Sequence, residues 1–474
     1  DVQGRVCVRF IGFSSRVLSA PLSSEHPAAH QAVEGLSAVT DSVPPLVGEL
    51  TLSPVWDVVK PERDQTKPTA ERRVLLVECA SPEYGQDRSA PESIRDGLLR
   101  QYPKAASLTL QATDSVDEIV RALQAIGPFP HLVWSVPPAE FEVDSPALIQ
   151  AQQIGVLLGF KLIKALLALG YDAQPLELTV LTVQMQAVAA GDVVHCAHAS
   201  IHGLIGSLAK EYTRWRVRLV DVPDQSTQPL AELWALPAQA NGNAWGWRHG
   251  QWYQQQFLPC TLPELTQSAY RSGSVVVIVG GAGGIGEVFS QHLISKHQVQ
   301  VIWIGRRAED GAITQKRERL ATLGPKPHYI SVDATDRAAL QAAYHEIKAQ
   351  FGAVHGVVHA TIVLKDKGLA GMDEETFAVS LAAKVDASVN VSAVFGQEPL
   401  EYVLFFSSMQ SSTKAPGQSN YAAGCTFIDT YAQALRQAWR CPVKVVNWGY
   451  WGSVGVVASD EYRKRMAQVG LESI

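Results

Sequence analysis

Three polar side chains toward the end of the chain have the chemistry that reduction of a carbonyl group requires: Lys384, Ser408 and Tyr421. A phenol with a pKa near ~10 keeps its proton at neutral pH, and a nearby ammonium group lowers that pKa, so Tyr421 could protonate a carbonyl oxygen as hydride reaches the carbon. The Ser408 hydroxyl could hydrogen-bond the same oxygen and stabilise its developing charge. Taken singly, the three residues also suit structural roles, as a solvated lysine, a strand-end cap and a helix-start aromatic.

A glycine-rich loop earlier in the chain could hold the hydride donor. The stretch VVVIVGGAGGIGEVF, residues 275–289, passes from a β-branched run into glycines and then into a helical pattern. This context is typical of dinucleotide binding, because glycines let the backbone approach the pyrophosphate and the helix N-terminus is positive. The expected contacts are Gly280, Gly281, Gly283, Gly284, Ile285 and Gly286. The alternative is a tight turn that binds no ligand.

The next strand ends in arginines, which favours NADPH over NADH. Arg306 stands 20 residues after Gly286 (306 − 286), where folds that prefer NAD carry an acid for the ribose hydroxyls. A guanidinium there would pair with a 2′-phosphate, and Arg307 could share this role. The alternative is a pair of solvated arginines at a strand end. The further cofactor contacts that we expect are Asp333, for the adenine, and Lys384 and Tyr421.

The elements that must position these residues alternate in the manner of a parallel sheet. From residue 74 onward, short apolar strands alternate with longer helical stretches, which predicts an α/β fold with helices on both faces of the sheet. The first such unit lacks a cofactor loop, because the turn after VLLVEC reads ASPEYGQD and has no run of glycines. We therefore expect two Rossmann-like subdomains, a truncated structural half and an NADPH-binding catalytic half.

An internal repeat supports this division. Residues 177–221 align without gaps with residues 403–447, at a constant offset of 226 (403 − 177). The aligned pairs include Thr182 with Ser408 and His195 with Tyr421. The two halves are thus expected to be duplicates of one fold, of which the first has lost its chemistry.

The chain is predicted to have three parts. Residues 1–45 are interpreted as the tail of a preceding domain and a Ser/His/Pro-rich linker, residues 46–265 as the structural subdomain, and residues 266–474 as the catalytic subdomain. The charged, proline-broken segment 60–73 is expected to be a surface loop. Since the chain begins with Asp rather than Met, we expect it to be a piece of a larger protein.

Composition excludes several classes of function. The net charge is −6 and the basic residues are scattered, which argues against nucleic acid as the main partner. The six cysteines show no metal-ligand spacing, so we expect reduced thiols and no metal site. There is no basic-then-apolar leader and no run of eighteen apolar residues, which predicts a cytoplasmic protein without a membrane span.

The motifs together resemble the short-chain dehydrogenase/reductase family, and specifically the ketoreductase domains of modular polyketide synthases, in which the lysine also precedes the serine. Such domains are similar in having a cofactor-free Rossmann half before the catalytic half. The stretches SNYAAGCTFIDTYAQALR, HATIVLKDKGLAGMDEETF and VNWGYWGSVGVVAS look most like synthases whose acyltransferase acts in trans, and residues 1 to about 20 look like the end of a dehydratase domain. The resemblance implies NADPH-dependent reduction of a β-ketoacyl thioester, held through phosphopantetheine on an acyl carrier protein, within a multienzyme that includes neighbouring synthase domains.

A loop at 364–366 and position 413 bear on stereochemistry, and position 425 bears on the proton relay. Leu364, Lys365 and Asp366 resemble a Leu-Asp-Asp-type loop whose second aspartate marks ketoreductases of the B type, so the resemblance implies a D-configured β-hydroxyl. Position 413 is threonine, whereas the opposite group carries tryptophan there. Many relatives have asparagine four residues after the tyrosine, where it supports the lysine and a water; here that residue is Cys425.

Two other functions stay open. The domain could be a redox-inactive scaffold, or could only epimerise an α-substituent; retention of the glycine loop, Lys384, Ser408 and Tyr421 favours an active reductase. A nucleotide-sugar enzyme of the extended reductase type would carry lysine at position 425, where this chain has cysteine.

Overall fold

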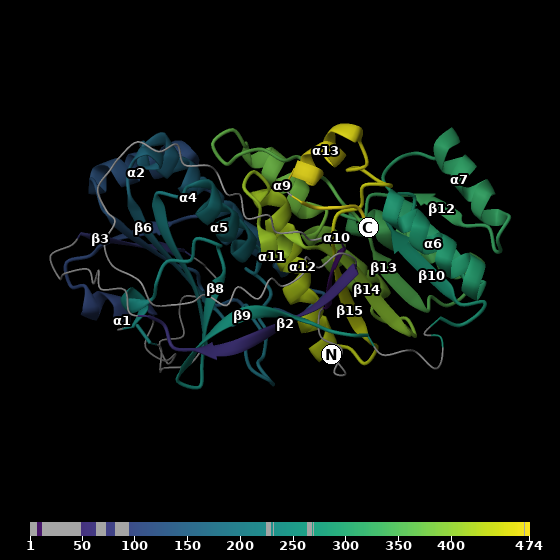
Figure 1. Ribbon diagram of the computed structural model, residues 1–474, viewed down its shortest axis with the longest axis horizontal. Helices are drawn as coiled ribbons and strands as arrows, with labels where there is room; N and C mark the ends of the chain where they lie inside the picture. Colours follow the sequence, from purple (N-terminus) through teal and green to yellow (C-terminus); the bar gives the residue numbers. More distant parts are fainter. Residues whose placement is uncertain are drawn as a thin grey trace, which may run out of the picture.

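The computed structural model describes residues 7–11, 49–62, 73–80, 94–223, 229–230, 232–262, 268, 270–468 and 470–474. Most of the predicted linker before residue 45 and most of the predicted surface loop at 60–73 lie outside the described residues. In the described residues one 15-stranded sheet runs through the protein in the order β12-β11-β10-β13-β14-β15-β1-β2-β9-β8-β7-β6-β5-β3-β4, with helices packed along it (Figure 1).

The second half of the chain forms a parallel sheet with the strand order of a dinucleotide-binding fold. Its strands are β10 (Val275–Val279), β11 (Gln300–Gly305), β12 (His328–Ser331), β13 (Gly356–His359), β14 (Tyr402–Ser408) and β15 (Val443–Trp448). The order β12-β11-β10-β13-β14-β15 corresponds to 3-2-1-4-5-6. Strands β11 and β12 lie on one side of β10, and β13 to β15 lie on the other, so the strand order reverses at β10. In such folds ligands bind at this switch point, at the carboxyl ends of the strands.

Helices cover both faces of this sheet. The helices of this half are α6 (Gly284–His297), α7 (Gly311–Ala321), α8 (Arg337–Phe351), α9 (Glu374–Ala382), α10 (Val385–Phe395), α11 (Gln410–Thr413), α12 (Ser419–Ala438) and the exposed α13 (Asp460–Gln468). All five residues of β10 are buried, and successive side chains point to opposite faces. Val277 packs in one core cluster with Leu340 of α8, whereas Ile278 packs in another with Leu293 of α6. Burial on both faces explains why β10 is an unbroken β-branched run.

Within the described part of the chain, the first half repeats the strand order of the second half but has no counterpart of β12. Its strands are β3 (Val74–Cys79), β4 (Ala106–Leu110), β5 (His131–Ser135), β6 (Leu176–Val183) and β7 (Trp215–Val222), in the parallel order β4-β3-β5-β6-β7. Its helices are α1 (Ile94–Gln101), α2 (Val116–Ile126), α3 (Ala147–Ile154), α4 (Val156–Ala168) and α5 (Ser200–Glu211), with short 3-10 turns η1 (Tyr171–Ala173) and η2 (Leu233–Ala235). Strands β6 and β7 are the repeat counterparts of β14 and β15.

Four further strands join the two halves in the middle of the sheet. They are β1 (Cys7–Ile11), β2 (Glu49–Val59), β8 (Ala244–Arg248) and β9 (Gln251–Pro259). Strand β1 pairs in parallel with β15, and β8 pairs in parallel with β7, while the long strands β2 and β9 pair antiparallel between them (Figure 1). Residues 7–11, assigned from the sequence to the tail of a preceding domain, thus lie in the sheet of the catalytic half.

The halves also meet through the helices of the repeat, α5 and α12. A Cβ atom on Gly203 of α5 would come 2.3 Å from the carbonyl carbon of Ala422 and from the nitrogen of Ala423 in α12, so only glycine permits this approach of the two backbones. The Gly203 backbone N–H donates to the Thr426 hydroxyl at 3.1 Å. The first half therefore holds the helix that carries Tyr421.

Two segments are long and apolar enough to cross a membrane by length and composition, at 147–168 and 374–395. In both, 72% of the most apolar window is buried inside the protein. They are the paired helices α3–α4 and α9–α10, and their apolar side chains pack in the core. We attribute the high hydropathy of these two helix pairs to their packing in the core of the protein.

Candidate active site

The three residues predicted to carry the chemistry are brought together at the carboxyl edge of the second sheet. Ser408 ends β14, Tyr421 lies in the first turn of α12, and Lys384 is the N-cap residue of α10. Lys384 and Tyr421 are buried, and the Lys384 Nζ lies 6.0 Å from the centre of the Tyr421 ring. The Ser408 and Tyr421 side chains are hydrogen-bonded to each other. The Lys384 Nζ donates to the Phe406 carbonyl at 2.9 Å, which fixes the ammonium behind the ring.

Burial sets the protonation states of Tyr421 and Lys384. It raises the pKa of Tyr421 well above its ordinary value, and the hydrogen bond from Ser408 offsets only part of that rise. Cys425 and Asp366 add to the rise, so desolvation and these neighbours together set the direction of the shift. Burial also lowers the pKa of Lys384, against the opposing effects of Cys425 and Asp429. Tyr421 is thus protonated across the neutral range, which is the form that a proton donor needs.

Cys425 lies one helical turn after Tyr421 on the same face of α12 and is fully buried. Burial raises the pKa of its thiol to about 12, so it is a neutral group. Its sulfur interacts with the Tyr421 hydroxyl and with the Ser407 hydroxyl. One turn further along α12 stands Asp429, a residue not predicted from the sequence. Its position, two turns after Tyr421 on one helix face, is the signal that could have revealed it.

The glycine loop has the geometry of a phosphate cradle. Gly280 takes a φ of 88°, a left-handed conformation that favours glycine. A Cβ atom on Gly286 would lie 2.7 Å from the Gly280 carbonyl oxygen, so the loop closes tightly against the start of α6. Helix α6 begins at Gly284, and its first N–H groups face the loop. The loop residues therefore fit a dinucleotide pyrophosphate.

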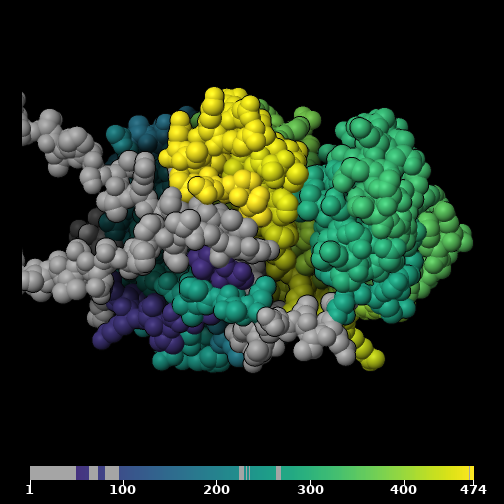
Figure 2. All heavy atoms as spheres, turned by 45° about the vertical axis from the view of Figure 1, so that its right-hand side comes forward, coloured from purple at the N-terminus to yellow at the C-terminus, as the bar shows by residue number. Residues whose placement is uncertain are grey.

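The C-terminal segment lies against this loop. A Cβ atom on Gly284 would come 2.4 Å from the backbone nitrogen of Gly455. Figure 2 shows the C-terminal residues, in yellow, beside the teal block that contains α6. The segment after β15 thus borders the predicted cofactor site.

The two arginines at the end of β11 differ in what they contact. Arg307 forms an exposed ion pair with Asp310, with 3.1 Å between Nε and Oδ2. Arg306 is exposed and has no hydrogen bond or ion pair with any residue that the structure describes. Asp333 accepts hydrogen bonds from the backbone and hydroxyl of Thr335 at 2.9 and 2.8 Å. Of the two guanidinium groups, that of Arg306 is the one available to an anion.

The predicted stereocontrol loop is tied to the residues that flank the catalytic tyrosine. Gln418 Nε2 donates to Asp366 Oδ2 at 2.6 Å, and Asn420 Nδ2 donates to the Lys365 carbonyl at 3.0 Å. Partial burial raises the pKa of Asp366. Gln418 and Asn420 were not predicted from the sequence, although Asn420 directly precedes Tyr421 in the SNYAAG motif and Gln418 directly precedes that motif. Asp366 is thus held against the start of α12.

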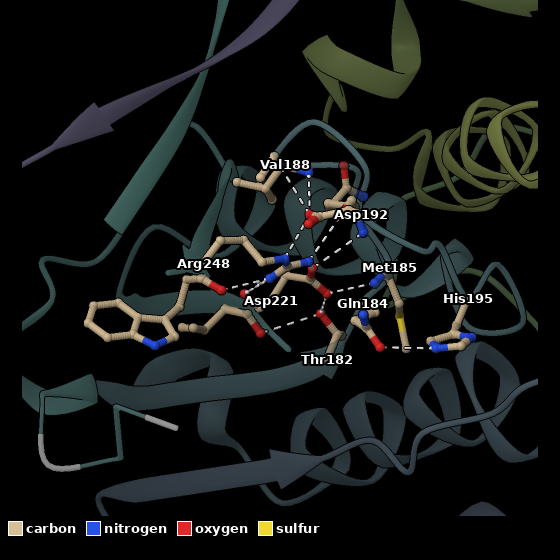
Figure 3. Close-up of polar contacts among 12 residues, drawn as sticks. Thr182, Gln184, Met185, Val188, Asp192, His195, Asp221 and Arg248 are labelled. Carbon is tan, nitrogen blue, oxygen red and sulfur yellow. Dashed lines mark hydrogen bonds and ion pairs between the residues drawn. The ribbon is translucent and has the colours of Figure 1, made fainter. Parts of the chain in front are cut away.

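The matching positions of the first half contain an internal polar network (Figure 3). Thr182, the counterpart of Ser408, donates to Asp221 Oδ1 at 2.8 Å, and His195, the counterpart of Tyr421, contacts Gln184 Oε1 at 3.0 Å. Buried Asp221 also pairs with buried Arg248, with 2.7 Å between Oδ2 and Nη2. The polar side chains at these positions of the first half are thus hydrogen-bonded or ion-paired with one another.

Comparison with known proteins gives the following relationships. Residues 274–453 match the KR domain family. The chain is 43% identical over 475 residues, all of its length, to polyketide synthase PksN of Bacillus subtilis, and 40% identical over 99% of its length to polyketide synthase PksM of the same organism. The chain spans 8% and 10% of the length of these two relatives.

Solved structures have the same fold. An A1-type ketoreductase has a TM-score of 0.73 at 22% identity, and the comparison covers 89% of this chain and 87% of that one. A ketoreductase domain from the bacillaene assembly line has a TM-score of 0.65 at 18% identity, covering 88% of this chain and 89% of that one. The Rossmann-like α/β fold predicted from the sequence is thereby confirmed.

Proposed function

This chain contains a KR domain of the kind that modular polyketide synthases carry, and from that premise we propose that it is an NADPH-dependent reductase of β-ketoacyl thioesters. The observation that carries the proposal is the convergence of Lys384, Ser408 and Tyr421 at the sheet edge that also holds the glycine loop. The substrate that we propose is an acyl chain bound through phosphopantetheine to an acyl carrier protein. We further propose that the chain works in the cytoplasm, within a multienzyme whose acyltransferase acts in trans and whose upstream neighbour is dehydratase-like.

In the proposed reaction, Tyr421 is the proton donor. Its phenol is protonated at neutral pH, because burial raises its pKa, and it is hydrogen-bonded to Ser408. A ketone oxygen held between the two hydroxyls would accept a hydrogen bond from each, so the charge that develops on it is stabilised. Lys384, fixed by the Phe406 carbonyl, stands behind the ring to restore the proton.

The glycine loop would hold NADPH, which when bound would provide the hydride. The loop from Gly280 to Gly286 and the start of α6 would hold its pyrophosphate, and Arg306 would hold its 2′-phosphate. Asp333 would face the adenine.

Arg306→Ala is expected to weaken the binding of NADPH far more than that of NADH. Only NADPH has the phosphate that this guanidinium would bind, and a hydrogen bond to a charged group contributes roughly 1.5–3 kcal/mol. Titration followed by tryptophan fluorescence gives both dissociation constants without turnover. Arg307→Ala is the matched control and should have a smaller effect, since Arg307 already pairs with Asp310. An equal loss for both cofactors in Arg306→Ala would show that this residue does not bind the phosphate.

We predict a D-configured product, the 3R alcohol for a simple unsubstituted chain. Asp366, held by Gln418 beside Tyr421, is proposed to direct the phosphopantetheine arm to one side of the site, so that one face of the ketone meets the hydride. Chiral chromatography of the product from a carrier-bound substrate measures this directly. Mainly the L-alcohol would contradict the B-type assignment while leaving the reductase assignment intact.

A paired assay separates reduction from the alternative functions. We expect consumption of NADPH with a β-ketoacyl thioester, measured together with the loss of deuterium from the α carbon of the same substrate. Loss of deuterium without reduction would identify an epimerase, and neither reaction would identify a redox-inactive scaffold.

A further inference from the structure

A partly buried carboxylate lies on the same helix as the catalytic tyrosine, two turns further along. Asp429 shares one face of α12 with Tyr421 and Cys425. Its Oδ2 accepts a hydrogen bond from Asn447 Nδ2 at 2.6 Å. Its Oδ1 is buried and has no hydrogen-bond partner among the described residues. The Ser411 and Ser407 hydroxyls also interact with this carboxylate, so it lies in a polar setting.

Asp429 is linked to the catalytic residues by charge and by hydroxyl contacts. It interacts electrostatically with Lys384, and the Ser407 hydroxyl interacts with both Asp429 and Cys425. The thiol of Cys425 in turn contacts Tyr421. Since a thiol is a weak hydrogen-bonding group, Cys425 does little to hold a water beside the lysine. The nearest strong proton-exchanging group on this helix face is Asp429.

On its other side Asp429 lines a polar cavity between the two halves of the protein. The cavity has a volume of about 60 Å³. The polar side chains around it include Gln186, His202 and Asn243 from the first half and Ser411, Lys414 and Asn447 from the second. A single water needs about 10–15 Å³ of such space and several polar partners, so this cavity can hold a short chain of waters.

We propose that Asp429 and this cavity form the relay that returns a proton to Lys384 and Tyr421 after each reduction, in place of a side-chain amide at position 425. The proposal rests on the proposed reductase function. It gives the non-catalytic half a part in the reaction, because His202 and its neighbours complete the wall of this cavity. Asp429 is a positioning residue in this scheme, since it touches neither substrate nor cofactor.

The proton balance is simple. The O–H bond of Tyr421 breaks as its proton joins the ketone oxygen, and the phenolate takes a proton from the Lys384 ammonium. The neutral amine then takes the proton of the Asp429 carboxyl, and the carboxylate takes one from a cavity water that exchanges with solvent. One hydride and one proton are consumed per ketone, and the three side chains end in their starting states.

The charges around Asp429 suit this exchange. Burial raises the pKa of its carboxyl to about 6, although Lys384 opposes the rise. Across the cavity, burial lowers the pKa of His202 to about 3 and that of Lys414 to about 7, so His202 is neutral and Lys414 is only partly charged at neutral pH. A carboxyl that titrates near the working pH can both give and accept a proton.

The test replaces the carboxyl with an amide of the same shape. We expect Asp429→Asn to lower kcat about tenfold, less than the loss of a direct proton donor would, with KM for NADPH unchanged and a larger solvent deuterium isotope effect on kcat. The rise of kcat as pH falls through about 6, expected in the parent enzyme, should be absent. Adding Cys425→Asn should restore much of the lost kcat, because an amide there can hold a water beside Lys384.

Glu398→Gln is the matched control. It changes a carboxylate whose side chain is 4% exposed and ion-paired with Lys348, away from the site, and should alter stability without altering the isotope effect. Unchanged kcat and isotope effect in Asp429→Asn would overturn the proposal. So would a lower kcat with an unchanged isotope effect and no rescue by Cys425→Asn, since that result would mean a structural role.

A second readout needs no turnover. Infrared difference spectra between about pH 5 and pH 7 should contain a protonated carboxyl band that Asp429→Asn removes. Absence of that band would overturn the relay even if the protein proved not to be a reductase. A parent protein that shows the band but reduces no ketone would refute the proposed function alone.

Discussion

Tyr421→Phe is expected to lower kcat by about 10²–10⁴-fold, the range that a positioned proton donor contributes, while leaving the dissociation constant of NADPH nearly unchanged. The change removes one buried hydroxyl and keeps the ring that fills the space beside Lys384. Steady-state kinetics with a β-ketoacyl thioester, together with a fluorescence titration of NADPH, measure both quantities. A near-normal kcat would contradict the assignment of Tyr421 as the donor.

The same helix supplies the control for this variant. Tyr431 is a fully buried tyrosine of α12 whose hydroxyl donates to the Val143 carbonyl at 2.6 Å. Tyr431→Phe therefore deletes a buried phenolic hydroxyl at the interface with the first half. We expect it to cost about 1 kcal/mol of stability and to leave kcat within a small factor of the parent value. A loss of kcat as large as that of Tyr421→Phe would mean that helix disturbance explains both results.

Arg248→Met should lower the free energy of unfolding by about 3–5 kcal/mol, because it leaves a buried carboxylate without its partner. The Arg248 guanidinium donates to Asp221 Oδ2 at 2.7 Å and to Asp192 Oδ2 at 2.8 Å, and Asp221 is fully buried (Figure 3). Chemical denaturation followed by tryptophan fluorescence measures the loss. The control is Arg271→Ala, which removes an exposed ion pair with Glu401 and should cost only about 0.2–1 kcal/mol.

The cost of Arg248→Met should depend on pH with a definite sign. Burial already raises the pKa of Asp221 in the parent protein, although Arg248 opposes that rise. Without the guanidinium the folded-state pKa rises further above the unfolded value, so the folded variant takes up a proton over a wider range. The stability gap between variant and parent should therefore be smallest in acid and grow as pH increases toward neutrality. A gap that does not change with pH would show that lost packing, rather than the unpaired charge, is responsible.

Much of the fold could be predicted because local patterns and tertiary structure agree. The apolar run of β10 is buried on both faces, and the glycines after it open α6 in the predicted place. The repeat at offset 226 places β6 and β7 as counterparts of β14 and β15. The proximity of Ser408, at a strand end, and Tyr421, at a helix start, could also be predicted, since the carboxyl ends of parallel strands meet at one edge of the sheet.

The remaining features depend on contacts between distant segments. Strand β1 pairs with β15 across most of the chain length, and no periodicity in residues 7–11 reveals that partner. The rise in the pKa of Tyr421 follows from how deeply it is buried, which depends on how the two halves close around α12. The one sequence signal for Asp429 is its place two turns after Tyr421 on the same helix face, and the cavity between the halves beside it is visible only in the structure.

The most direct test of the proposed function follows a labelled hydride. The protein is incubated with a β-ketoacyl group on an acyl carrier protein and with NADPH that carries deuterium at the transferred position, and the product is examined by mass spectrometry and NMR. We expect one deuterium on the β carbon of a β-hydroxyacyl product, formed by the parent protein and nearly absent with Tyr421→Phe. Recovery of the β-ketoacyl chain without deuterium, from a parent protein that binds NADPH, would contradict the proposed function.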